Sequence, residues 1–163
     1  MLRGEFIVLG PRGIEQIIPN TVVTEGEQAF LDMMMRADAT VVAPSGAYHM
    51  GLMGDAIVRS LTLGTIVGEP NATGGYARKA INRSATGWPT AGLVNGIPYV
   101  QSLPQIFAAT GVDFSIAVER PFIASAATGA GTLFSIGAAF ASPITVTAGV
   151  TAGLSIAYRI YMR

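Results

Sequence analysis

The clearest secondary-structure pattern in the chain is its ending, Leu154-Ser155-Ile156-Ala157-Tyr158-Arg159-Ile160-Tyr161-Met162-Arg163. Large apolar residues occupy every second position from Leu154 to Met162, and smaller or polar residues stand between them. Because successive side chains of a β-strand point to opposite faces, this alternation predicts a strand. We expect it to bury one face and to leave a mixed face outside.

The stretch that leads into this strand, residues 121–158, contains no charged residue. Its length would allow a membrane-spanning helix, but several glycines, Pro143 and many Ser and Thr residues interrupt it, which argues against one. The same punctuation predicts two or three short strands. Their small outer side chains would let another chain approach closely, so we expect this stretch to be part core and part subunit contact.

Between residue 37 and this stretch, short apolar runs are divided by Gly, Pro, Asn and Ser, a spacing typical of an all-β sandwich or barrel. Across the whole region we expect strands at residues 48–52, 75–82, 97–103, 105–108, 114–119, 122–125 and 133–140. Residues 54–68 fit either a short helix or a loop with a strand.

The N-terminal part carries the best helix signal. Thr24-Glu25-Gly26-Glu27 has the pattern of a capping box, in which the Thr hydroxyl and the Glu carboxylate bind free backbone N–H groups at a helix start. We expect this helix to run to about residue 36, with Phe30 and Leu31 on its apolar face. Residues 1–19 alternate apolar pieces with turn signals, which indicates an arm or a hairpin.

Together these patterns predict a mainly β fold. The expected architecture is a β-sandwich with one N-terminal α-helix at about residues 24–36. An extended N-terminal arm would comprise residues 1–19, and residues 20–163 would form a single domain. A chain of 163 residues can bury roughly 70% of the surface that its unfolded form exposes, which is enough for one core.

The composition narrows the classes of partner. Only 12% of the residues are charged, and ten acidic residues balance ten basic ones. A nucleic-acid partner would require clustered Lys and Arg, so we expect none. A surface with so few charges is poorly protected against association, so we expect the exposed faces to contact other protein chains. The chain has no cysteine, which excludes disulfides and thiolate chemistry.

A catalytic function has one candidate constellation. His49 is the only histidine, and Ser45 and Asp55 are the nearest candidates for a nucleophile and an orienting acid. The Gly-x-Ser-x-Gly turn that presents a hydrolase nucleophile is missing from the sequence, so a structural His49 is the favoured interpretation. With one histidine and no cysteine, we expect neither a metal nor a cofactor. A small Ser/His hydrolase stays a remote alternative.

Subunit contacts are a candidate use of the remaining conspicuous residues, although a plain solvated strand face is the favoured interpretation of the basic cluster. The apolar arm offers backbone and side chains for a neighbour, Arg78, Lys79 and Arg83 form the only basic cluster, and Trp88 stands between Gly87 and Pro89 as a core plug or an interface anchor. The candidate interface residues are Phe6, Ile7, Val8, Ile17, Arg78, Lys79, Arg83, Trp88 and Tyr161.

Five short motifs occur in order along the chain. They are Asn20-Thr-Val-Val-Thr-Glu-Gly-Glu-Gln-Ala-Phe-Leu31, Tyr48-His-Met-Gly-Leu52, Glu69-Pro70, Gly75-Tyr-Ala-Arg78 and Thr86-Gly-Trp-Pro89. In this order they resemble a group of small virion structural proteins of tailed bacteriophages, over about residues 20–118. The Tyr-bearing strand at the end of the chain is similar to the ending of these proteins.

The resemblance implies a non-enzymatic part of the virion, made in the host bacterial cytoplasm. For some similar proteins it implies a capsid cement or decoration role, in which a homo-oligomer binds the major capsid protein on the outside of the shell. A tail or neck protein is the alternative, because rings of small β proteins also stack there. We expect no membrane partner in either case.

Overall fold

The structure is a computed structural model, and it describes residues 2–10, 13–31, 46–54, 60–129, 131–150 and 152–162. The predicted C-terminal strand is present as β10 (Leu154–Met162). It pairs antiparallel with β1 (Leu2–Gly10) on one side, and with β6 (Ile97–Gln101) and β7 (Gln105–Phe107) on the other. Leu154, Ile156 and Tyr158 are buried in the main core, as the alternation predicts.

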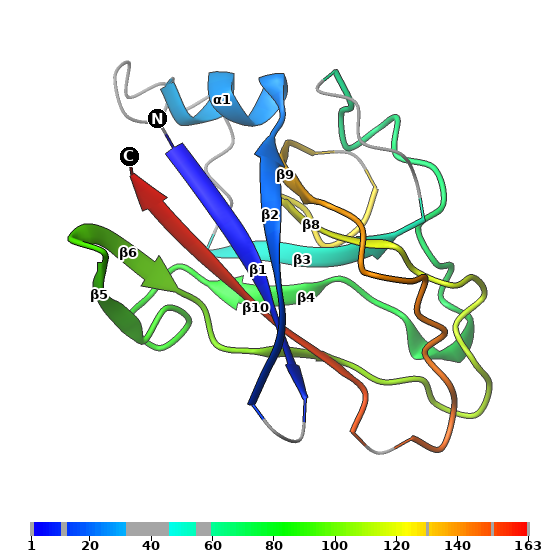
Figure 1. Cartoon of the computed structure of the whole chain (residues 1–163). Helices are drawn as coiled ribbons and strands as arrows, with labels where there is room; N and C mark the ends of the chain where they lie inside the picture. Colours follow the sequence, from blue (N-terminus) through cyan, green and yellow to red (C-terminus); the bar gives the residue numbers. More distant parts are fainter. Residues whose placement is uncertain are drawn as a thin grey trace.

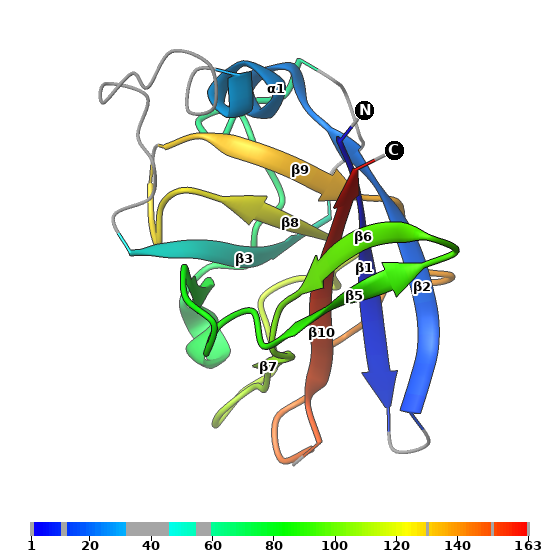
Figure 2. The ribbon, with the colours of Figure 1, turned by 90° about the vertical axis from the view of Figure 1, so that its left-hand side faces the viewer.

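The fold is mainly β, with one α-helix, which confirms the coarse fold class. The described strands form one curled antiparallel sheet in the order β4-β3-β8-β9-β2-β1-β10-β6-β5, with β7 beside β10 (Figures 1 and 2). The remaining strands are β2 (Gly13–Val22), β3 (Ala47–Met53), β4 (Lys79–Asn82), β5 (Thr90–Val94), β8 (Arg120–Ala124) and β9 (Leu133–Gly137). The sheet curls into a half-barrel around its core.

Residues 2–10 and 13–19 do not form the extended arm that was predicted. They belong to β1 and β2, which pair with each other and lie between β10 and β9 in the middle of the sheet. Phe6 and Ile18 are almost fully buried there. The turn signal between the two apolar pieces indicated the hairpin alternative correctly, and the proposed domain boundary after residue 19 falls inside β2.

The strands of the charge-free stretch belong to the core, whereas residues 127–129 and 141–150 are mostly exposed. The stretch contains most of β8, all of β9 and the first half of β10, and the side chains of Phe122, Leu133 and Ile136 have no exposed surface. Ile123 of β8 packs into the main core, whereas Phe122 packs into a second core on the opposite face of the strand. A strand that is buried on both faces shows a continuous apolar run, which explains why residues 121–124 do not alternate.

The helix α1 (Thr24–Leu31) begins where the capping pattern predicts. Its expected continuation to residue 36 lies outside the described residues. Gly26 lies so close to β9 that a Cβ atom at this position would be 2.2 Å from the Phe134 carbonyl oxygen, so only glycine lets the helix pack this closely. Leu31 was expected on the apolar face, but it is 53% exposed. The buried positions of the helix are Gly26 and Ala29.

Other boundaries also differ from the sequence prediction. The strand expected at residues 75–82 is only Lys79–Asn82, and the strand expected at residues 133–140 ends at Gly137. Residues 114–119 form only an isolated bridge, Val118 to Ile144, instead of a strand. Strand β5 was not predicted, because Thr-Ala-Gly-Leu-Val lacks a clear alternation. Residues 60–68, in the segment left open between helix and strand, contain a turn at residues 63–65 and no regular element. No helix in the described part of the chain is long and apolar enough to cross a membrane.

Candidate functional site

His49, the only histidine, lies in β3 and is partly buried. Burial is the main cause that lowers its pKa below the usual 6.5. A backbone hydrogen bond with Ser125 opposes this shift, and the positive charge of Arg78 adds a smaller lowering. Its Nδ1 atom is buried and has no hydrogen-bond partner among the described residues. Ser45 and Asp55, the other members of the hypothetical triad, lie outside the described residues. The described residues contain no group of three His, Asp or Glu side chains placed to hold a metal ion.

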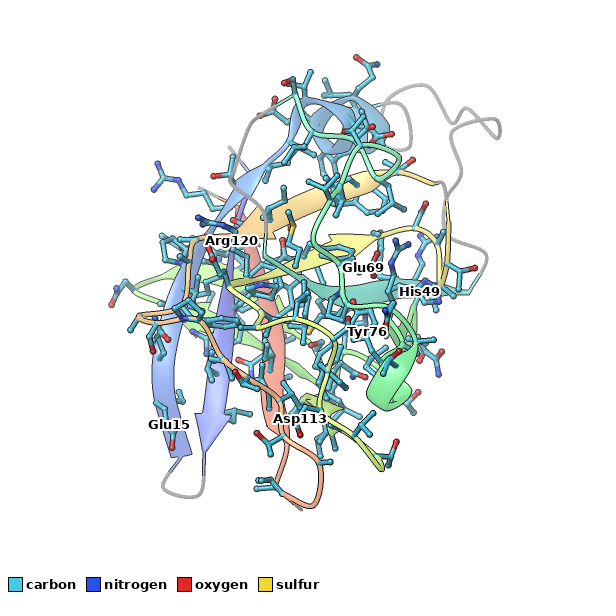
Figure 3. All side chains as sticks on the ribbon, turned by 90° about the vertical axis from the view of Figure 1, so that its right-hand side faces the viewer. Glu15, His49, Glu69, Tyr76, Asp113 and Arg120 are labelled. Carbon is cyan, nitrogen blue, oxygen red and sulfur yellow. The ribbon has the colours of Figure 1, made fainter. Side chains whose placement is uncertain are left out.

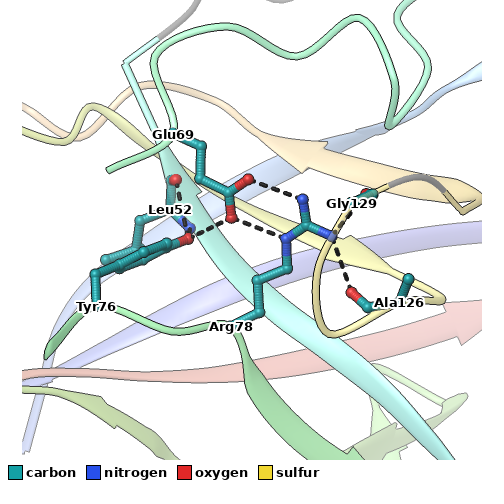
Figure 4. A network of polar contacts seen from close by, with 6 residues as sticks. All are labelled: Leu52, Glu69, Tyr76, Arg78, Ala126 and Gly129. Carbon is teal, nitrogen blue, oxygen red and sulfur yellow. Dashed lines mark hydrogen bonds and ion pairs between the residues drawn. The ribbon is translucent and has the colours of Figure 1, made fainter. Parts of the chain in front are cut away.

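Arg78, a predicted interface residue, is instead the centre of an internal polar network (Figure 4). Its Nε and Nη2 atoms donate to the two carboxylate oxygens of Glu69, each over 2.8 Å. Its Nη1 atom donates to the carbonyl oxygen of Ala126 at 2.9 Å, and more weakly to that of Gly129. Only 5% of the Arg78 side chain is exposed, so its charge is used inside the chain.

Tyr76 extends this network to β3. Its hydroxyl donates to Glu69 at 2.8 Å and accepts the backbone N–H of Leu52 at 2.9 Å. Burial, followed by the negative charge of Glu69, raises the pKa of Tyr76 far above its usual value, so the hydroxyl stays a donor. In Figure 3, His49, Glu69 and Tyr76 lie on the same side of the molecule. The network joins the segment at residues 69–78 to β3 and to the turn at residues 126–129.

Trp88 packs inward as part of an aromatic cluster. Its ring meets Tyr48 edge-on at 6.1 Å and Tyr158 at 6.3 Å, and Tyr48 in turn meets Phe134 at 5.2 Å. These rings line a cavity of about 110 Å³ between α1 and the sheet. The core-plug interpretation of Trp88 therefore agrees with its contacts in this chain.

A second internal network surrounds Tyr158. No pattern in the sequence indicates this network. The side-chain amide of Asn20 donates to the Tyr158 hydroxyl at 2.8 Å, and the hydroxyl of Ser135 lies 3.0 Å from it. Asn20 also accepts the backbone N–H of Gly4. Burial raises the pKa of Tyr158 well above its usual value, so this hydroxyl remains protonated. The network ties β1, β2, β9 and β10 together.

The other predicted interface residues differ in their exposure. Phe6, Ile7 and Val8 are at most 6% exposed, so they are core residues and offer no side-chain surface to a neighbour. Ile17 is half exposed, and Tyr161 is partly buried beside Tyr99 of β6. The basic cluster is divided among aromatic rings. The Lys79 amino group lies 6.0 Å from the Phe107 ring centre, and the Arg83 guanidinium lies 5.7 Å from that of Tyr48.

The largest concentration of exposed apolar residues lies on a segment that the interface prediction did not include. Residues 84–112 carry no charge, and they include the β5–β6 hairpin, β7 and the loops around them. We call this surface the uncharged edge. Its exposed large apolar residues are Leu93, Val94, Val100, Leu103, Ile106 and Val112. The long run without charge is visible in the sequence, but its exposure is not.

Fold and surface together define a mainly β protein with two internal polar networks and one exposed, uncharged edge. No protein-family model matches this chain, and a search of curated proteins found no match either.

Proposed function

We propose that this chain is a non-enzymatic structural protein of a tailed-bacteriophage virion, and that it acts as a capsid cement or decoration protein. On this proposal it binds the major capsid protein on the outside of the shell and stabilises the shell without any reaction. A jelly-roll-like sandwich is the architecture that the resemblance implies, and it remains part of the proposal.

The uncharged edge is the observation that carries this proposal. Exposed apolar side chains on a surface without charges favour association with another protein. Six large apolar side chains, each at least 37% exposed, lie on a segment of 29 residues without a charge. A neutral apolar surface suits a permanent contact with a large protein lattice better than it suits a soluble substrate.

The resemblance gains support from what its motif residues do. Leu52, Glu69, Tyr76 and Arg78 come from three separate motifs and meet in one hydrogen-bonded network. Tyr48 and Trp88, from two motifs, pack against each other. Residues that contact one another across the fold form a joint structural requirement, so their occurrence in order is consistent with a shared fold. They specify the architecture rather than the partner.

The deciding experiment is to separate heads from tails of the virions and to identify this chain by mass spectrometry. The proposal expects it in the head fraction, in a stoichiometric ratio to the major capsid protein. Purified protein should also sediment with heads that lack it. Recovery in the tail or neck fraction would replace the capsid role by the tail alternative, and absence from the virion would overturn both.

A matched pair of variants tests the contact surface. Ile106→Lys places a charge on the uncharged edge at a residue that is 54% exposed, and Val67→Lys places one elsewhere at a residue that is 65% exposed. We expect Ile106→Lys to weaken binding to heads by tenfold or more, since burying an unpaired charge is costly. Val67→Lys should bind like the wild type. Equal binding by both variants would show that the contact with heads does not lie on this edge.

The remote hydrolase alternative has a separate test. His49→Ala should leave head binding unchanged, because His49 lies in β3 and outside the uncharged edge. Loss of a measurable esterase or peptidase activity in this variant would favour an enzyme over the structural role.

A further inference from the structure

Strand β5 ends the sheet, and no strand of the described chain pairs with its outer side. The opposite end of the sheet differs, because β4 lies against β7. All residues of β5 are exposed, and none of them is charged. Natural proteins usually protect such an edge with lysine, proline or a bulge, since a free edge pairs readily with another strand. The sequence of β5, Thr-Ala-Gly-Leu-Val, has none of these protections.

The turn after β5 determines which backbone groups are free. Asn95 and Gly96 have φ values of 51° and 77°, which is the geometry of a two-residue type I′ hairpin turn. The flanking pair, Val94 and Ile97, is then hydrogen-bonded, and hydrogen-bonded pairs alternate with non-hydrogen-bonded pairs along the ladder. The N–H and C=O groups of Ala91 and Leu93 therefore point away from β6. Pro98, which has no N–H, lies opposite Leu93 in agreement with this assignment.

The side chains of the hairpin also lack a cover. Directly opposed residues in an antiparallel pair share a face, so Ala91 shares a face with Val100, and Leu93 shares it with Pro98. Val100 in turn lies opposite Ile160, which packs against the main core. The core-facing side of the sheet thus continues onto the hairpin, where Leu93 is 69% and Val100 is 41% exposed. In Figure 1 the hairpin extends from the left side of the molecule, away from the helix and β3.

We propose that β5 pairs antiparallel with β5 of a second copy of this chain, around a two-fold axis at Gly92. In this register Ala91 of one copy lies opposite Leu93 of the other, so the free N–H and C=O groups of both residues meet. A two-fold contact places identical residues close to each other, and a charged strand would repel itself. The absence of charge from residues 84–112 makes a second copy the occupant that this edge fits best.

The residue on the axis has the required size. In the paired strands the two Gly92 residues form a non-hydrogen-bonded pair, in which the Cα atoms approach to roughly 4.5 Å. No side chain fills this space from Gly92, and Tyr99 covers the glycine on its own hairpin, 3.2 Å from where a Cβ atom would lie. The leucines extend the apolar face of each hairpin across the axis. Pairing therefore buries the exposed side of both hairpins together.

The hairpin is held in place before any partner binds. Arg159 of β10 donates to the side-chain oxygen of Gln101 at 2.8 Å and forms a 2.7 Å ion pair with Glu5 of β1. Its guanidinium also lies 4.8 Å from the ring centre of Tyr99. Because these contacts fix the base of β6, little conformational freedom remains to be lost on association.

Cysteine crosslinking tests the register. The chain has no cysteine of its own, so a single introduced thiol reports only on the contact with a second copy. Gly92→Cys should form an intermolecular disulfide under mild oxidation, because roughly 4.5 Å between Cα atoms is within the range for disulfides. In Val94→Cys the two thiols would lie about 13 Å apart along the strands, so it should remain uncrosslinked. Equal crosslinking of both variants, or of neither, overturns the register.

Sedimentation equilibrium on the full chain tests the pairing itself. We expect a species of twice the 16.9 kDa chain mass. Leu93→Pro removes an outward N–H without removing a bond to β6, so it should give a folded monomer with an unchanged circular dichroism spectrum. Leu93→Ala keeps this donor and should weaken the dimer by roughly tenfold through lost apolar contact. A monomeric wild type, or an assembly that Leu93→Pro leaves intact, overturns the proposal.

This inference does not depend on the proposed virion role, and the two can fail separately. A monomer that still sediments with heads would overturn the β5 pairing and leave the cement role in place. A dimer that is absent from virions would overturn the cement role and leave the β5 pairing in place.

Discussion

At the scale of single residues, the polar groups inside this protein hold the fold together. Tyr76 and Tyr158 each place a buried hydroxyl among donors and acceptors from distant parts of the chain. Arg78 donates hydrogen bonds within the chain, to Glu69 and to the turn at residues 126–129. Because a buried group that loses its partner keeps its desolvation cost, these residues are sensitive positions.

Removing the charge of Glu69 should therefore destabilise the protein strongly. In Glu69→Gln the nearly buried Arg78 loses its bidentate partner, and we expect the free energy of unfolding to fall by about 2–3 kcal/mol. Urea denaturation measures this loss. The control is Glu15→Gln at an exposed position, with an expected change within about 0.5 kcal/mol. An equally small change in Glu69→Gln would show that the pair contributes nothing.

The lowered pKa of His49 should make stability depend on pH in one direction. Below about pH 6.5 the unfolded chain takes up a proton at His49, whereas the folded chain does so only at lower pH. The unfolded state then binds more protons, so the free energy of unfolding decreases as the pH falls from about 6.5 to 5. His49→Gln should flatten this part of the profile in urea titrations at several pH values. An identical slope in both proteins would contradict the shift.

At the scale of elements, the two hairpins have opposite roles. The β1–β2 hairpin lies in the middle of the sheet and contributes Phe6 and Ile18 to the core, whereas the β5–β6 hairpin ends the sheet and is exposed. Both consist of two antiparallel strands that are adjacent in sequence, and their sequences alone do not reveal this difference. Position in the sheet order decides which hairpin the fold requires.

Deleting residues 1–19 should therefore abolish cooperative folding rather than free the domain of an arm. The deletion removes β1 and residues 13–19 of β2, and it leaves β10 without its partner on one side and the core without Phe6 and Ile18. Thermal unfolding followed by near-ultraviolet circular dichroism should show no transition. As a control, a two-residue Asn-Gly turn replaces residues 93–98 and joins the hydrogen-bonded pair Gly92 and Tyr99, and it should leave the transition in place. A cooperative transition in the deletion variant would show that residues 1–19 are an arm that the fold does not require.

At the scale of the whole molecule, the low charge content has a structural counterpart. The chain of 163 residues has ten acidic and ten basic residues, and two long stretches contain no charged residue. One of these, residues 121–158, contributes its strands to the core, and the other, residues 84–112, is the uncharged edge. A long stretch without charges can therefore supply core strands or form an exposed surface.

Association through the uncharged edge should depend little on salt. Backbone hydrogen bonds and apolar contacts are not screened by ions, unlike contacts between exposed charges. Raising the NaCl concentration from about 50 mM to about 500 mM should therefore change the dimer dissociation constant by less than about threefold. Sedimentation velocity at both concentrations measures this. A loss of tenfold or more would indicate that charged residues outside this edge make the contact.

The sequence by itself determined the β-rich class, the closing strand and the start of the helix, because alternation and capping are local patterns that a strand or helix carries within itself. Only the tertiary structure decided that residues 2–10 lie between β2 and β10, that Arg78 is internal, and that β5 is a free edge. Strand order and burial depend on contacts between residues far apart in the chain, such as Asn20 with Tyr158 and Glu5 with Arg159. Periodicity within a segment contains no information about which distant segment will cover it.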